Sequence, residues 1–189
     1  NYCNTCGYIE IAPESRIDCS KFYTDDYNFL LTDDDVEPEL QGKSTSTYSV
    51  DFFGKYIDGG QNKSFFDIGA GKGNILSSFY NAFPSLKYYG LEPSPAYKKL
   101  AQKKFLAESY NKFFNADEFG GRTFDYLSIV GVLEHVENPF TFLCEIFKIM
   151  SPSSLLLVEV PNFSRNKYDL LTADHLSEFY PENIKNLFH

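Results

Sequence analysis

Short apolar runs alternate with helical patterns from about residue 46 onward, and this alternation predicts the fold class. The apolar runs predict strands at residues 64–68, 87–92, 112–115, 124–130 and 155–160. Apolar residues at helical spacing predict helices between them, at residues 74–83, 95–108 and 139–150. Strands and helices that alternate in this way form a mostly parallel sheet with helices on both faces. We therefore expect an α/β, doubly wound domain whose ligand lies at the carboxyl ends of the strands.

The N-terminal part of the chain departs from this pattern. Residues 1–45 predict a short cysteine-bearing segment followed by an acidic, polar linker, which includes three consecutive Asp residues at 33–35. After the linker, Tyr48, Phe52 and Tyr56 recur at helical spacing and predict a helix that leads into the core. We expect residues 1–45 to form a unit separate from the regular core.

The C-terminal part predicts the start of another helix at residues 181–188. A doubly wound domain that stops at this point lacks its last strands, so we expect the core of residues 46–189 to be incomplete at its C-terminal end. A truncated sequence and an unseen C-terminal portion are both consistent with this pattern.

Composition narrows the classes of partner. The chain is 43% hydrophobic and 17% aromatic, which is ample material for a folded core. A formal net charge of -9 argues against nucleic acid as a partner, because an acidic surface repels phosphates. No apolar run approaches the roughly 20 residues that span a bilayer, and no signal peptide is recognisable, so we expect a cytoplasmic location and no membrane partner.

A glycine-rich loop follows the first predicted strand and carries the strongest chemical signal. It reads Asp67-x-Gly69-x-Gly71-x-Gly73 and leads directly into a helix. Glycines let the backbone turn sharply and approach a ligand closely. A dinucleotide-binding loop places its third glycine one position later, where this chain has Asn74. Asp67 would repel a pyrophosphate but suits a ligand with an amino group or a cation.

An acidic residue ends the second predicted strand. Glu92 lies 19 residues after Gly73, and a carboxylate at this position can accept hydrogen bonds from both hydroxyls of a ribose. A solvated acid at a strand end is the alternative when this residue is taken alone. Together with the glycine loop, Glu92 favours a nucleoside ligand.

These motifs resemble those of class I S-adenosylmethionine-dependent methyltransferases, over roughly residues 46–180. Further stretches of the resemblance are residues 90–94, 115–117, 124–139 and 151–162, although Ser153 and Ser154 stand where the family usually has glycine. The resemblance implies a Rossmann-like methyltransferase sheet, S-adenosylmethionine as cofactor and a small-molecule methyl acceptor. The cofactor-binding residues that it implies are Asp67, Gly69, Gly71, Gly73, Glu92, Pro93, Ala116, Asp117, Gly131 and Leu133.

Within the family, residues 132–139 and 160–162 look most similar to a broad subgroup that includes sugar C-methyltransferases and enzymes of ubiquinone and polysaccharide synthesis. This similarity favours a sugar nucleotide or a polysaccharide precursor as acceptor. Residues 174–180 resemble a motif of the sugar enzymes that carries an acid and a histidine near the substrate. The resemblance implies His175, Asp174 and His135 as candidate catalytic residues, since histidine suits proton abstraction near neutral pH.

The cysteines suggest a second, structural feature. Cys3 and Cys6 form a C-x-x-C pair followed by Gly7, which resembles half of a zinc ribbon. Structural zinc needs four ligands and this pair supplies two, so a relic or two free thiols stay open as alternatives. Cys144 falls on the apolar face of a predicted helix and is expected in the core.

Two other functions remain as alternatives at this point. A nicotinamide-dependent oxidoreductase would share the doubly wound sheet, but the glycine spacing and Asp67 disfavour it. A non-catalytic module that binds S-adenosylmethionine, or acts through a zinc ribbon, would keep the same motifs. The pattern does not distinguish C-, O- and N-methylation, and it leaves the oligomeric state open.

Overall fold

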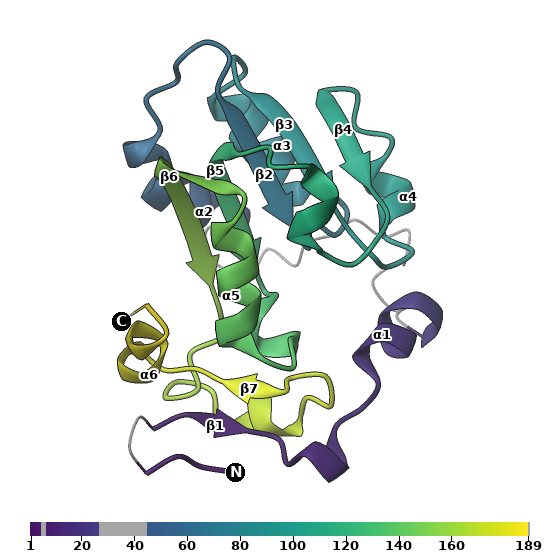
Figure 1. Ribbon diagram of the computed structural model, residues 1–189, viewed down its shortest axis with the longest axis vertical. Helices are drawn as coiled ribbons and strands as arrows, with labels where there is room; N and C mark the ends of the chain where they lie inside the picture. Colours follow the sequence, from purple (N-terminus) through teal and green to yellow (C-terminus); the bar gives the residue numbers. More distant parts are fainter. Residues whose placement is uncertain (5–6, 27–44, 189) are drawn as a thin grey trace.

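A five-stranded parallel sheet forms the centre of the molecule (Figure 1). The computed structural model describes residues 1–4, 7–26 and 45–188. The strand order is β4-β3-β2-β5-β6, and every neighbouring pair is parallel. The strands are β2 (Ser64–Ile68), β3 (Lys87–Leu91), β4 (Leu106–Tyr110), β5 (Phe124–Val130) and β6 (Met150–Glu159). This arrangement confirms the expected doubly wound, Rossmann-like sheet.

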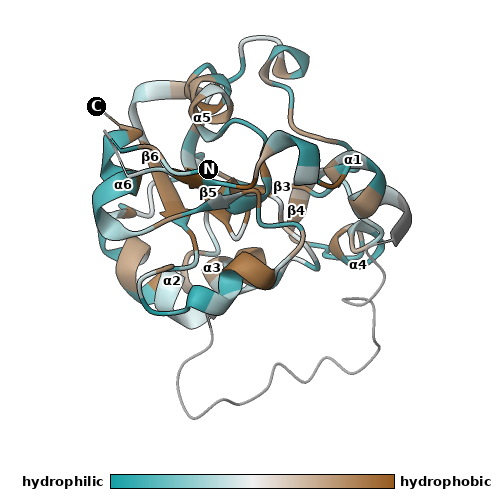
Figure 2. Cartoon of the chain, turned by 90° about the horizontal axis from the view of Figure 1, so that it is seen from below, coloured by the Kyte–Doolittle hydropathy of each residue, from teal (hydrophilic) through white to brown (hydrophobic). Residues whose placement is uncertain are grey.

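Helices cover both faces of the sheet. In Figure 2 the apolar strands lie between α5 on one side and α2 and α3 on the other. The helices are α1 (Cys19–Lys21), α2 (Thr45–Phe53), α3 (Asn74–Ala82), α4 (Tyr97–Leu100), α5 (Pro139–Phe147) and α6 (Pro181–Asn186). None of the helices in the described parts of the chain is long and apolar enough to cross a membrane.

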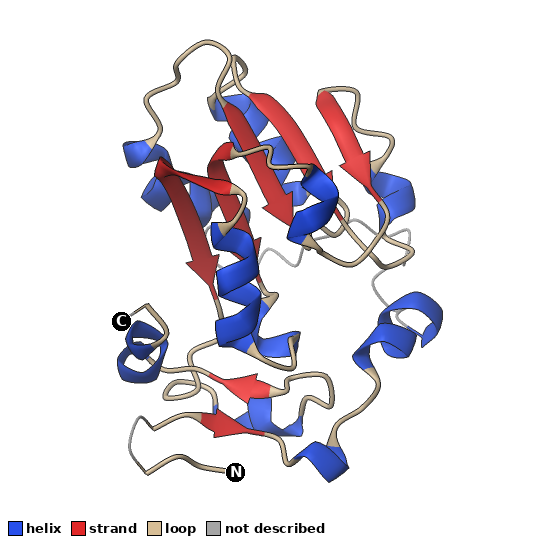
Figure 3. Cartoon of the chain, in the orientation of Figure 1, coloured by secondary structure: helices blue, strands red, loops and turns tan. Residues whose placement is uncertain are grey.

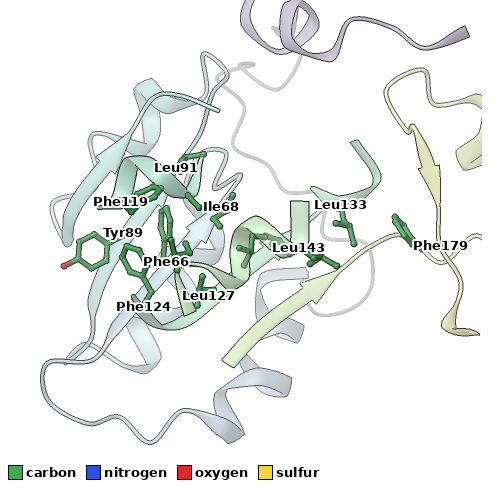
Figure 4. Close-up of a cluster of buried hydrophobic side chains, with 14 residues drawn as sticks. Phe66, Ile68, Tyr89, Leu91, Phe119, Phe124, Leu127, Leu133, Leu143 and Phe179 are labelled. Carbon is green, nitrogen blue, oxygen red and sulfur yellow. The ribbon is translucent and has the colours of Figure 1, made fainter. Parts of the chain in front are cut away.

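The core consists of two apolar layers because consecutive strand residues point to opposite faces. Phe65 and Phe66 are both fully buried, but they belong to different clusters. Phe65 packs against Phe79 of α3, with ring centroids 4.5 Å apart. Phe66 belongs to the cluster drawn in Figure 4, which also includes Leu143 of α5 and extends to Phe179 near the C-terminal end.

A small second sheet joins the two ends of the chain. Strand β1 (Ile9–Glu10) pairs antiparallel with β7 (Ser177–Glu178), as Figure 3 shows. Side chains reinforce the pairing, because the Tyr8 and Ser177 hydroxyls are 2.5 Å apart and Tyr180 donates a hydrogen bond to the Gly7 carbonyl. The described N-terminal segment is therefore anchored to the end of the core.

The third strand of the sheet is not where the sequence predicts it. Strand β4 runs from Leu106 to Tyr110 rather than over residues 112–115, and α4 ends at Leu100 rather than continuing to residue 108. Strand β4 lies at an edge of the sheet, and Ala107 and Glu108 within it are exposed. An edge strand of this kind has no continuous apolar run, so its hydrophobic pattern cannot be distinguished from that of the preceding helix.

The helix predicted to lead into the core is present as α2, but its packed face is not its apolar stripe, and the core position expected for Cys144 is wrong. Tyr48, Phe52 and Tyr56 are exposed, whereas Ser49 and Phe53 form the buried face of α2. Ser49 is accommodated there because its hydroxyl donates a hydrogen bond to Glu159 of β6. On α5 the buried residues include Leu143 and Ile146, so Cys144 faces outward and is exposed. In both helices the apolar stripe in the sequence is wider than the face that packs.

Candidate functional site

A cavity of about 650 Å³ opens at the carboxyl ends of β2, β3 and β5. This is the position expected for a ligand of a doubly wound sheet. The glycine loop after β2, the end of β3 and the loop after β5 form most of its wall. Its lining includes Cys19, Ser20, Tyr23, Gly69, Gly71, Glu92, Pro93, Phe113, Phe114, Gly131, Val132, His135 and Phe142.

The glycine loop is shaped by positive backbone angles. Gly69, Gly71 and Gly73 have φ values of 79°, 53° and 81°, which side chains disfavour. A Cβ at Gly69 would lie 2.4 Å from the Val132 side chain, so this glycine lets the two loops meet. A Cβ at Gly71 would have no neighbour within 4 Å, so this glycine leaves its part of the cavity open to a ligand.

Glu92 is held rigidly against this loop. Its side chain is buried, Oε2 accepts a hydrogen bond from the Gly71 N–H at 2.7 Å, and Oε1 accepts one from the Ser94 N–H at 2.8 Å. A carboxylate oxygen accepts more than one hydrogen bond, so the group stays able to receive ligand hydroxyls. The structure thus places the predicted ribose-binding acid on the cavity wall in a fixed orientation.

Asp67 lies beneath the loop and not on the cavity wall. It is buried in β2, where Oδ1 accepts a hydrogen bond from the Ser128 hydroxyl at 2.6 Å and Oδ2 has no partner. Burial raises the pKa of Asp67 to about 7, the Glu92 charge adds to the rise, and the Ser128 hydrogen bond opposes it. The predicted contact between Asp67 and the cofactor stays a prediction.

Four other predicted cofactor residues do not line the cavity, namely Gly73, Ala116, Asp117 and Leu133. Ala116 and Leu133 are buried in the apolar cluster of Figure 4, and Asp117 is an exposed residue whose carboxylate lies 3.9 Å from the Lys148 ammonium. Phe113, Phe114 and Val132 line the cavity, and so do Pro93 and Gly131. Cofactor binding by the predicted residues stays a prediction.

An N-terminal wall of the cavity was not predicted. Cys19, Ser20 and Tyr23 line it, from α1 and the π-helical turn Phe22–Asp26 that follows. Tyr23 is fixed by donating a hydrogen bond to Asp174 at 2.8 Å. Burial and, to a lesser extent, nearby carboxylates raise the pKa of the Cys19 thiol to about 11, so it remains a neutral thiol. No local pattern in residues 19–23 signals contact with a site more than 40 residues away.

The three predicted catalytic residues come together at one end of the cavity. His135 Nδ1 lies 2.9 Å from the Asp174 carbonyl and 3.3 Å from the Asp174 carboxylate. The His135 and His175 rings meet edge to face with centroids 4.9 Å apart. His135 lines the cavity, whereas Asp174 and His175 lie behind it. Burial lowers the pKa of His135, and the Asp174 carbonyl and carboxylate oppose this effect.

Glu134 belongs to the same group and was missed. It is 3% exposed, its Oε1 is 3.8 Å from His135 Nε2, and its Oε2 has no hydrogen-bond partner. Burial, with smaller contributions from Asp174, Glu178 and Asp169, raises its pKa to about 7. Glu134 stands in the motif next to His135, so an adjacent acid and histidine were the available signal.

The cysteine segment is only partly described. The Gly7 N–H donates to the Cys3 carbonyl at 2.9 Å, and the Cys3 N–H donates to the Tyr8 carbonyl at 2.8 Å, so Cys3 is tied to Gly7 and Tyr8. Gly7 has a φ of 73°, a backbone conformation that favours glycine. Cys6 and the run of Asp at residues 33–35 lie outside the described residues. Zinc binding by Cys3 and Cys6 stays a prediction.

Comparison with known families identifies the domain. A family model described as a methyltransferase domain matches residues 43–189. The chain belongs to this methyltransferase family. The match covers the central sheet, the glycine loop and the histidine group, and it argues against the nicotinamide alternative. No curated protein sequence matches the chain significantly.

Solved structures share the fold of this chain. A SAM-dependent methyltransferase from Archaeoglobus fulgidus is 21% identical, with a TM-score of 0.59 over 86% of this chain and 72% of the other. The plantazolicin methyltransferase BpumL in complex with SAH is 17% identical, with a TM-score of 0.56 over 76% of this chain and 58% of the other.

A third match is SAM-bound CalS10, an amino pentose methyltransferase from Micromonospora echinaspora. It is 18% identical, with a TM-score of 0.51 over 65% of this chain and 53% of the other. The present chain spans just over half the length of CalS10 and of BpumL. At these identities the comparisons establish the fold.

Proposed function

We propose that this chain binds S-adenosylmethionine in the cavity and transfers its methyl group to a small-molecule acceptor. The observation that carries the proposal is Glu92, a buried carboxylate held by the Gly71 and Ser94 amides at the mouth of an open glycine loop. This arrangement presents fixed acceptors to the ribose hydroxyls of a nucleoside. Family membership supplies the reaction class.

The side chains of the wall divide the cavity by polarity. Glu92 offers the polar contact for the ribose, and Phe113, Phe114 and Phe142 offer an apolar surface against which an adenine ring packs. The open space beside Gly71 receives the amino acid portion of the cofactor. The residues that remain, around Tyr23 and His135, then face the acceptor.

The chemistry demands little of the protein beyond placement. The bound cofactor supplies an activated methyl group and a good leaving group, because its sulfonium becomes a neutral thioether. An electron pair of the acceptor would form the bond to the methyl carbon while the carbon–sulfur bond breaks, and any proton on the acceptor atom would leave to a base or to solvent. Holding the two reactants in line contributes about 7–11 kcal/mol of barrier reduction. The cavity walls provide that alignment and exclude water.

The acceptor that we propose is a sugar nucleotide or a polysaccharide precursor. Support comes from the similarity of residues 174–180 to a motif of sugar methyltransferases and from the shared fold with CalS10. Incubation with labelled S-adenosylmethionine and a panel of nucleotide sugars tests this class. Transfer to a non-sugar metabolite alone would contradict it.

Calorimetric titration with S-adenosylhomocysteine tests the cofactor site. Wild-type protein should bind it and should not bind NAD. Gly71→Val should abolish binding, because the new side chain occupies the open space at the loop.

Gly120→Val is the matched control for this titration. Gly120 has a φ of 58° and, like Gly71, no neighbour within 4 Å, but it does not line the cavity. The control therefore carries similar backbone strain and should still bind S-adenosylhomocysteine. Equal affinity of both variants would remove the proposed site.

A further inference from the structure

The group formed by Glu134, His135 and His175 has the composition of a metal site. One potential ligand atom from each of the three residues lies within 4.8 Å of the other two. Ligand atoms that share one ion at bond lengths of about 2.0–2.2 Å are separated by about 3–4 Å, so small side-chain rotations close the triad. Two histidines with one carboxylate are a common ligand set for first-row divalent metals.

Two atoms of this triad have no hydrogen-bond partner although they are buried. They are Oε2 of Glu134 and Nδ1 of His175. Glu134 is 3% exposed, so water does not readily replace a missing partner. A buried polar atom that stays unpaired is costly, and most such atoms in native proteins are satisfied by a protein group, a water or an ion.

The charges around the triad also point to a cation. Asp169, Asp174 and Glu178 surround Glu134, and each of these carboxylates is buried or nearly so. Asp169 Oδ2 and Glu178 Oε1 lack partners as well. Within the described residues none of these acids forms an ion pair with a lysine or arginine. A divalent ion supplies the missing positive charge.

The orientation of His135 fits a ligand. Its Nδ1 lies against the Asp174 carbonyl at 2.9 Å, so Nδ1 carries the proton and Nε2 presents a lone pair. Nε2 is the nitrogen that faces Glu134, at 3.8 Å from Oε1. Metal-bound histidines are typically fixed in this way, by donating their other N–H to a carbonyl or carboxylate. Tyr23 in turn anchors Asp174 through its hydroxyl.

We propose that Glu134, His135 and His175 bind a divalent transition-metal ion, of the Zn²⁺ class, at the end of the cavity. Because three protein ligands leave a coordination position open, the ion can also bind an oxygen of the methyl acceptor. This last role rests on the proposed methyltransferase function, whereas metal binding itself does not. In this arrangement His135 Nε2 serves as a ligand and not as a free base.

Zinc titration of chelator-treated protein by calorimetry tests the site. The background for every measurement is Cys3→Ser/Cys6→Ser, which removes the thiols that would bind zinc independently. One equivalent of Zn²⁺ should bind to this background. Glu134→Gln and His175→Ala should each weaken binding about 100-fold or more, because removing a ligand costs more than the roughly 10–100-fold loss typical of an outer-shell change.

Glu182→Gln is the matched control, since Glu182 is exposed on α6 and outside the group. Circular dichroism checks that each variant is folded, and if His175→Ala does not fold, Glu134→Gln decides. The absorption spectrum of the Co²⁺ form should show nitrogen and oxygen ligation without thiolate charge-transfer bands. Absence of zinc binding, or equal binding by Glu134→Gln and the control, would overturn the proposal.

Titration of the same background with S-adenosylhomocysteine separates the two proposals. Binding of the nucleoside without zinc overturns the metal site and leaves the proposed function intact. Binding of zinc without binding of the nucleoside overturns the proposed function and leaves the metal site intact.

Discussion

Two groups of buried carboxylates flank the cavity, and the protein satisfies them in different ways. Glu92 accepts a hydrogen bond from a backbone N–H at each oxygen, so neither oxygen is left without a partner when no ligand is bound. Glu134 leaves Oε2 without a partner, and its acidic neighbours Asp169 and Glu178 each leave one oxygen unpaired. A group satisfied by the backbone serves as a rigid template for a neutral ligand. A buried carboxylate with an unpaired oxygen is instead stabilised by taking up a proton or by binding a cation.

The largest expected effect is a pH dependence of stability that comes from Asp67. This residue is an exception to the comparison, because it lies in the glycine-loop region and yet its Oδ2 has no partner. The pKa of Asp67 is raised to about 7, above its ordinary 3.8, so the native state favours the protonated form. Stability from this group is present below about pH 4 and is lost as pH rises to about 7, by up to about 4 kcal/mol. Asp67→Asn should flatten this slope.

Urea unfolding between pH 4 and 8 measures the slope. Asp117→Asn, at an exposed carboxylate, should leave it unchanged. Glu134 and Glu178, whose pKa values are also raised to about 7, contribute a residual slope in the Asp67→Asn variant. An identical slope in wild type and Asp67→Asn would mean that Asp67 is ionised in the native state.

The next largest effect is a loss of stability in Gly69→Ala, which tests whether the glycine loop is a rigid, preformed part of the site. Gly69→Ala places a Cβ 2.4 Å from the Val132 side chain at a φ of 79°. Strain and overpacking together should lower the free energy of unfolding by about 3 kcal/mol. Gly59→Ala, at a φ of 64° with no neighbour within 4 Å, carries only the strain and should cost about 1 kcal/mol. Equal losses in urea unfolding would show that the Val132 contact relaxes freely.

Affinity for S-adenosylhomocysteine distinguishes the two carboxylates directly. Glu92→Ala should weaken binding by about 1.5–3 kcal/mol, because charge-assisted hydrogen bonds to the ribose are lost. Glu134→Gln should leave the affinity within about twofold, since the Glu134 side chain does not line the cavity. Calorimetry on both variants gives the comparison, and a similar loss in the two would erase the distinction between the groups.

The smallest effect concerns the small sheet that supports the histidine group. Tyr180→Phe removes the hydrogen bond from its hydroxyl to the Gly7 carbonyl, 2.7 Å long. We expect a loss of about 1 kcal/mol in the free energy of unfolding, the usual net value of a hydrogen bond. Tyr168→Phe, on a side chain 79% exposed, should have no measurable effect. Faster proteolysis near Gly7 in Tyr180→Phe alone would confirm the role of the contact.

The fold could be predicted where strands are buried on both faces. Strands β2 and β5 begin and end at the predicted residues because each is mostly apolar and is covered by helices on both faces. Strand β4 could not be located, since its exposed Glu108 interrupts the pattern at the sheet edge. The buried faces of α2 and α5 could not be predicted for a related reason. Apolar residues in the sequence do not show which side of a helix packs against a neighbour.

The meeting of site residues could be predicted from spacing where they are close in sequence, and from the family resemblance for His135, Asp174 and His175. The glycine loop and Glu92 share one strand–helix–strand unit, so spacing alone indicated their meeting. Tyr23 reaches Asp174 across 151 positions, and no pattern encodes such a contact. Glu134 was hidden for another reason. It adjoins His135 in the sequence, but its importance depends on burial and on the absence of a partner, which only tertiary structure provides.

The pairing of β1 with β7 has a consequence for how the molecule assembles. It joins residues separated by 169 positions, as between Tyr8 and Ser177, so it is a contact of very high sequence separation. Contacts of this kind form late, because closing a long loop costs entropy before any interaction compensates it. During synthesis the central sheet can form first, while the segment that carries Cys19 and Tyr23 waits for residue 178. The cavity therefore acquires its last wall only when the two ends of this chain have met.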